Sequence, residues 1–127
     1  MPDTRSNQAE YPQLSAQAPG CGFPIARIVV VFSLAVGTVL DAAIGKYAGK
    51  QTGENSMFRT LSDCLGEGDV VLADRYFSGW FDIALLKQRG VDVVVRKHQL
   101  RATDFRKGWR LGKDDHLVCW SKPARPG

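Results

Sequence analysis

The stretch that decides the fold is "GDVVLADRYFSGWFDIALLKQRGVDVVVRKH", residues 68–98. Two short apolar runs flank a segment in which Phe81, Ala84 and Leu85 recur at helical spacing, with Ile83 and Leu86 widening the same stripe. Uninterrupted apolar runs are typical of strands that are buried on both faces of a parallel or mixed sheet. The stretch therefore predicts a strand, a helix and a second parallel strand, joined by a right-handed crossover.

The ends of the central helix are also marked in the sequence. Ser78 is a good N-cap residue, and Asp82 falls in the first turn, where a negative charge is favourable. Lys87 and Arg89 fall in the last turn, and Gly90 follows at the place where helices commonly end. These signals predict a helix over residues 78–89.

Upstream of this unit, the sequence predicts a β-hairpin and another helix. Residues 26–34 and 38–48 look like two strands, joined at Gly37, which can take the positive φ of a tight turn. Apolar residues then recur every fourth position at Met57, Leu61 and Leu65, so residues 52–65 predict an amphipathic helix. Thr52 or Asn55 is the expected cap.

Length and composition indicate one ordinary globular domain. The chain has 127 residues, of which 44% are hydrophobic and 24% charged. Three scattered cysteines without a CxxC pair predict reduced thiols in a cytoplasmic protein. The longest apolar run, residues 28–40, is shorter than the ~20 residues that span a membrane, so no membrane segment is expected. We divide the chain into an irregular lead-in (1–22), an α/β core (23–97) and a basic C-terminal part (98–127).

Positive charge is concentrated towards the C-terminus. From Val91 onward there are 9 Lys and Arg against 4 Asp and Glu, whereas the preceding residues have 8 against 9. Such a surplus suits a polyanion such as nucleic acid, although a solvated basic surface would look the same. Residues 110–120 resemble a further hairpin that turns at Gly112–Asp115.

Asp74 is the main candidate for chemistry. It follows the first strand of the central unit, and ligands of open α/β sheets gather at the carboxyl ends of strands. A carboxylate there suits a hard cation such as Mg²⁺, but Asp74 could equally accept hydrogen bonds from the next turn or pair with Arg75. The residues alone favour the structural role, because one carboxylate does not make a metal site.

A phosphate-binding loop is the other candidate. Residues 45–53, "GKYAGKQTG", look like one at first sight. They miss the GxxxxGK[ST] spacing by one residue and place Gln51 where Ser or Thr should bind the metal. A nucleotide-binding domain is therefore not favoured.

Several motifs in order resemble a known family. "KQTGEN" (50–55), "LADRYF" (72–77) after an apolar strand and "GVDVVVR" (90–96) are similar to the catalytic core of bacterial insertion-sequence transposases. The group is named after insertion sequence four and belongs to the DDE transposases of RNase H-like fold. The resemblance covers essentially the whole chain.

The resemblance implies DNA transposition by two-metal chemistry. Three acids hold two Mg²⁺ ions, which activate water and then a DNA 3′-hydroxyl for attack on phosphodiesters. Asp74 matches the second acid. DNA would be the partner, at the element's ends and in the target, and the intact family suggests a homodimer in the bacterial cytoplasm, at the nucleoid. The expected DNA contacts are basic: Arg75, Arg96, Lys97, Arg101, Arg106, Lys107 and Arg110.

The chain also departs from the family's pattern. The first acid belongs to a strand that would precede Met1, and the third to a late helix with Tyr, Arg, Glu and Lys that is not found before Gly127. We therefore expect an RNase H-like mixed sheet without its first strand and last helix, with residues 98–127 beginning a β-rich insertion. Such a fragment would carry one acid of three and be inactive alone. The alternative is a non-catalytic DNA-binding or interaction remnant that interferes with an intact transposase.

Overall fold

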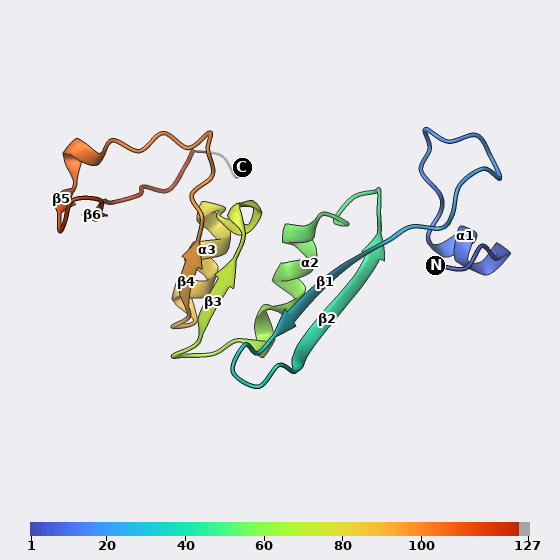
Figure 1. The fold of residues 1–127 in the computed structure, drawn as a ribbon, viewed down its shortest axis with the longest axis horizontal. Helices are drawn as coiled ribbons and strands as arrows, with labels where there is room; N and C mark the ends of the chain where they lie inside the picture. Colours follow the sequence, from blue (N-terminus) through green and yellow to red (C-terminus); the bar gives the residue numbers. More distant parts are fainter. Residues whose placement is uncertain (125–127) are drawn as a thin grey trace. The chain divides into compact units, whose positions relative to one another are not determined.

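The structure is a computed structural model that describes residues 1–124. It is a small mixed α/β fold in two compact units, residues 1–66 and 67–127, the last three residues of which lie outside the described part. The described residues form three two-stranded sheets, β1–β2, β3–β4 and β5–β6, together with the helices α1, α2 and α3 (Figure 1). None of these helices is long and apolar enough to cross a membrane.

The first unit is built on the predicted hairpin. β1 (Ala26–Phe32) pairs antiparallel with β2 (Val39–Lys46), and the register places Ile28 opposite Ile44 and Val30 opposite Ala42. Gly37 in the connection has a φ of +67°, as the sequence predicted. A shift of register between Val31 and Phe32 marks a bulge near the turn.

Helix α2 (Glu54–Leu61) covers one face of this hairpin and is continued by a 3-10 turn, Ser62–Cys64. Its apolar stripe is buried: Leu61 is only 3% exposed, and Met57 and Phe58 are buried beside it. The expected side-chain cap was wrong, because the N-cap is Gly53 and neither Thr52 nor Asn55 caps the helix. Thr52 instead donates its hydroxyl to the carbonyl of Gly49 within the loop.

The second unit contains the predicted strand–helix–strand arrangement. β3 (Val70–Ala73) and β4 (Asp92–Val95) are parallel, and α3 (Trp80–Gln88) connects them and packs against β4. Asp82 lies in the first turn of α3, and Gly90 follows its end with a φ of +75°. Val91, at the entry to β4, is completely buried.

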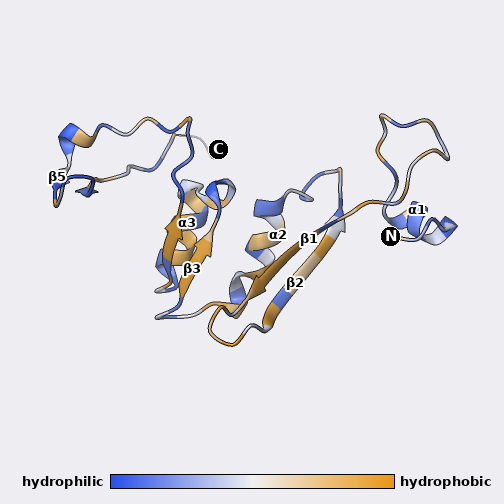
Figure 2. Cartoon of the chain, viewed as in Figure 1, coloured by the Kyte–Doolittle hydropathy of each residue, from blue (hydrophilic) through white to orange (hydrophobic). Residues whose placement is uncertain are grey.

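Two details of this unit differ from expectation. Ser78 does not cap α3: the N-cap is Gly79, and the Ser78 hydroxyl donates to the carbonyl of Arg75, closing a 3-10 turn at Arg75–Phe77. The strands are also not buried on both faces. Exposure alternates along them, and Val70 and Leu72 are 62% and 65% exposed, because the described chain covers only the face towards α3. Figure 2 shows how apolar residues run along β1, β2 and β3.

The terminal segments contain short elements. Residues 1–22 include α1 (Arg5–Glu10), a six-residue helix capped by the Thr4 hydroxyl, which accepts from the N–H of Asn7. Near the other end, β5 (Trp109–Arg110) pairs antiparallel with β6 (His116–Leu117). The connection closes when Leu111 N–H donates to the carbonyl of Asp115, which confirms the predicted hairpin turn.

Candidate nucleic-acid interface

Asp74 lies at the carboxyl end of β3 and is exposed to solvent. Its Oδ1 accepts a 2.7 Å hydrogen bond from the N–H of Tyr76 and so caps the 3-10 turn that follows. Part of this carboxylate is therefore used in the local turn, as the structural alternative expected. Among residues 1–124, its other oxygen has no hydrogen-bond partner.

The sheet register brings a cation next to this carboxylate. Ala73 on β3 pairs with Val95 on β4, and the strands are parallel, so Asp74 and Arg96 leave the same edge of the sheet side by side. Arg96 is exposed, and no ion pair joins it to Asp74 or to another residue in the part of the chain that the structure describes. An arginine without an internal partner keeps its planar set of donors for an outside group such as a phosphate.

The remaining predicted DNA contacts fall into two classes. Lys107 resembles Arg96, since it is exposed and has no side-chain partner among residues 1–124. The others are engaged within the protein. Arg75 donates to the side chain of Gln99, Lys97 to the carbonyl of Arg101, Arg101 to the carbonyl of Ser78, Arg106 to Asp104, and Arg110 to the carbonyl of Gly112.

The Arg106–Asp104 pair is a local contact in a 3-10 turn, Phe105–Lys107. Arg106 Nε and Nη2 lie 3.0 and 3.3 Å from the two carboxylate oxygens, and its own N–H lies 3.1 Å from Oδ1. These hydrogen bonds hold the pKa of Asp104 below its ordinary value, with the side-chain bond as the larger cause. A lowered pKa means that this contact favours the folded turn above the ordinary pKa of Asp and is lost as pH falls through the folded pKa.

Replacing Arg106 with alanine should therefore raise the pKa of Asp104 towards its ordinary value of about 3.9. A titration of the Asp104 carboxyl ¹³C resonance by NMR measures this directly. Lys107→Ala removes a neighbouring charge without touching the pair, so it should leave the Asp104 titration where it is in the unsubstituted protein. Equal shifts in both variants would mean that general charge, and not this contact, sets the pKa.

The metal expectation can be tested against the same residues. Among residues 1–124 no group of three or more His, Cys, Asp or Glu is placed to hold an ion. Asp74 stands by itself, with one oxygen already held by Tyr76 N–H. The residues present thus do not fit a two-metal centre, which requires several converging acids.

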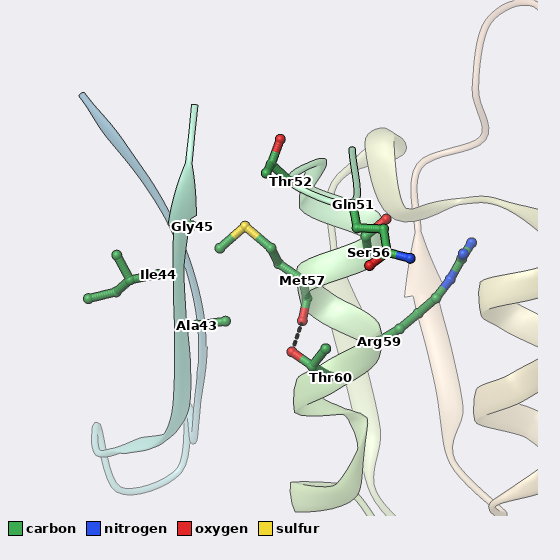
Figure 3. Close-up of a pocket in the computed structure, with 9 residues that line it drawn as sticks. All are labelled: Ala43, Ile44, Gly45, Gln51, Thr52, Ser56, Met57, Arg59 and Thr60. Carbon is green, nitrogen blue, oxygen red and sulfur yellow. Dashed lines mark hydrogen bonds between the residues drawn. The ribbon is translucent and has the colours of Figure 1, made fainter. Parts of the chain in front are cut away.

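The loop that resembles a phosphate loop lines a groove in the first unit. The groove has a volume of about 480 Å³, lies between β2 and α2, and is open to solvent. Figure 3 shows Met57 reaching from α2 towards Gly45, where a Cβ would lie 3.1 Å from its sulfur, while Arg59 points away. The Thr52 and Thr60 hydroxyls already donate to carbonyls of Gly49 and Met57. This arrangement packs a helix on a hairpin and lacks the converging donors of a phosphate cradle.

Comparisons with protein families, with curated proteins and with solved structures found no match. The position of Asp74 after its strand was predicted from the sequence, but Arg96 was included in the second predicted strand, which in the structure ends at Val95. The stacking of Arg101 could not be predicted from the sequence, because the aromatic ring over its guanidinium belongs to Trp120, which is distant along the chain.

Proposed function

We propose that this chain is a DNA-binding part of a DDE transposase of the insertion-sequence-four group, with an RNase H-like core. The observation that carries the proposal is the carboxyl edge of the β3–β4 sheet, where Asp74 and an unpaired Arg96 stand side by side. In open α/β sheets this edge is the usual place for a ligand. The motif resemblance around Asp74 supports the same position for the second acid of the family.

The charges of this unit are compatible with a phosphodiester ligand. Arg96 offers a charged fork to phosphate oxygens, and Lys107 adds a second free cation in the basic C-terminal part. The sequence from Val91 onward has a net surplus of five positive charges, which also favours a polyanionic partner. On this proposal Asp74 is one of three acids, and the chain binds DNA without cutting it. Interference with an intact transposase would be one consequence of such binding.

DNA binding measured by fluorescence anisotropy tests the proposal. For the full chain on a labelled 20-base-pair duplex, we expect a dissociation constant that rises with salt. Replacing Arg96 and Lys107 with alanine should reduce the slope of log affinity against log salt by about 2, since each phosphate contact contributes about 0.9.

The matched control removes two exposed cations from the first unit, Arg5 and Lys50, neither of which is in the basic part. Arg5→Ala with Lys50→Ala lowers the net charge by the same amount but should change the salt slope little. Binding that is independent of salt, or an equal loss in the two double variants, would reject the proposed interface. Nicking of the duplex by the pure chain in Mg²⁺ or Mn²⁺, abolished by Asp74→Ala, would reject the non-cutting assignment.

A further inference from the structure

Arg101 and Trp120 connect the basic C-terminal part to the 3-10 turn Arg75–Phe77, which Asp74 caps; we call this the Asp74 turn. Arg101 Nη2 donates a 2.6 Å hydrogen bond to the carbonyl of Ser78. The indole ring of Trp120 covers the same guanidinium, with the ring centroid only 3.5 Å from Cζ. The Trp120 carbonyl in turn accepts a 3.0 Å hydrogen bond from the indole N–H of Trp80, the first residue of α3. We call Ser78, Trp80, Arg101 and Trp120 the latch.

The position of Arg101 makes it a poor phosphate contact. One face of the guanidinium is stacked on the ring, and one of its nitrogens is held by a buried residue, since Ser78 is 1% exposed. Desolvation lowers the pKa of Arg101, although an arginine stays charged at any physiological pH. A stacked and hydrogen-bonded guanidinium would have to give up these contacts before it could reach DNA.

The latch acts on the turn that carries Asp74. Ser78 ends the 3-10 turn Arg75–Phe77, and its hydroxyl donates to the Arg75 carbonyl. Asp74 caps the beginning of the same turn through the N–H of Tyr76. A second connection runs parallel to the latch, because Arg75 Nη1 lies 3.0 Å from Oε1 of Gln99. Both ends of the Asp74 turn are thus tied to residues 99–120.

We propose that Arg101 is a positioning residue: with Trp120 it holds the basic segment 97–111 against the turn that presents Asp74. Its role in DNA binding, which rests on the proposed function, is indirect. The latch orders the segment that contains Lys107, and the free cations make the contacts. The contacts of the latch all lie within the second unit, so its existence can be tested without DNA.

Conservative substitutions separate this role from a direct contact. Arg101→Lys keeps the charge but loses the planar group that stacks on the ring while bonding Ser78, so it should open the latch as Arg101→Ala does. Trp120→Ala removes the ring and should have the same effect. Trp120→Phe retains an aromatic face over the guanidinium and should rescue most of the order. A direct phosphate contact predicts the reverse: lysine is tolerated and Trp120 is irrelevant.

Amide hydrogen exchange on the full chain, read by mass spectrometry, measures the order of the segment. We expect exchange in residues 97–111 to become roughly tenfold faster in Arg101→Ala, Arg101→Lys and Trp120→Ala. Trp109→Ala is the control, because Trp109 is 67% exposed and lies on β5 outside the latch. Unchanged exchange in β3 and β4 shows in each case that the unit remains folded. Exchange at the unsubstituted rate in Arg101→Lys or Trp120→Ala overturns the latch.

DNA binding by the same variants completes the test. The latch predicts that Arg101→Lys and Trp120→Ala lower the affinity to a similar extent and that Trp120→Phe restores it. If Arg101→Lys binds as the unsubstituted chain does while Arg101→Ala reduces the salt slope by about 1, Arg101 contacts phosphate and the proposal is wrong. If no variant and not even the unsubstituted chain binds DNA, the proposed function fails, while the exchange rates still decide whether the latch exists.

Discussion

Replacing Leu61 with alanine is expected to lower the free energy of unfolding of the first unit by about 3 kcal/mol, because a large buried side chain leaves a cavity behind. Leu61 is 3% exposed and lies at the end of α2, one helical turn after Met57. Met57 in turn contacts the hairpin at Gly45. The two side chains share the face of α2 that covers β1 and β2.

The effect should be large relative to the total stability of this unit. Its buried apolar residues are few: Val29 on β1 and Met57, Phe58 and Leu61 on α2. Domains of this size are stable by only 5–15 kcal/mol at most. Removing one of four buried apolar side chains therefore shifts the population of unfolded hairpin and helix by about two orders of magnitude.

Urea denaturation followed by circular dichroism, with exchange of the α2 amides as a local probe, gives the measurement. Thr60→Ala is the matched control, since Thr60 is the neighbouring residue, is exposed at the rim of the groove, and its removal should cost less than about 1 kcal/mol. A loss below 1 kcal/mol in Leu61→Ala would mean that α2 does not hold the hairpin through this stripe.

The local elements were predictable because each is specified by residues close in sequence. Gly37 supplies the positive φ that the hairpin needs, and Gly90 does the same after α3. The run of mostly β-branched apolar residues in 26–32 and the four-residue repeat from Met57 to Leu61 are equally local. These signals depend on backbone geometry and helix periodicity alone, so no knowledge of the partner surface was needed.

Burial was predicted less well. The sequence shows that a side chain is apolar, but it does not show which other part of the protein covers that side chain. The sequence around Val70 and Leu72 predicts a strand that is buried on both faces, yet the described residues cover only one side of β3. The predicted start of helix α3 at Ser78 was also wrong. Ser78 has the chemistry of a cap, but a 3-10 turn intervenes and its hydroxyl is used there. Helix α1 was missed because its six residues, all polar except Ala9, carry no periodic signal.

The candidate site divides in the same way. The parallel pairing and the place of Asp74 at the end of its strand were predicted from local signals, but the end of the second strand before Arg96 was not. Whether a basic side chain is free or engaged depends on contacts distant in sequence. Arg101 and Arg96 look equivalent in the sequence, but only Arg101 has an aromatic ring over its guanidinium.

The chain is also expected to self-associate at micromolar concentrations through the uncovered faces of its two larger sheets. On the hairpin, Ile28 and Ile44 are a cross-strand pair, each 60% exposed. On the parallel pair, Leu72 lies opposite Val94, and these are 65% and 55% exposed. Apolar faces of this kind, on sheets whose outer edges have no strand partner among the described residues, favour association with another chain.

Threonine at these four positions should suppress the association, because it keeps the β-branched shape that suits a strand while removing apolar surface. We expect the concentration at which light scattering rises to increase by about tenfold in the fourfold variant. Sedimentation velocity over the same concentration range would show whether the remaining species is a monomer.

The control variant must remove similar apolar surface from outside the sheet faces. Leu100 and Leu111 are 83% and 65% exposed and lie in connecting segments, so Leu100→Thr with Leu111→Thr should leave the scattering threshold unchanged. If association depends on exposed apolar surface in general, this double variant will raise the scattering threshold as much per replaced residue as the sheet variant does. If the unsubstituted chain is a monomer with one sharp, reversible thermal transition, the prediction is wrong. Such a result would mean that the protein is stable with these apolar faces exposed to solvent.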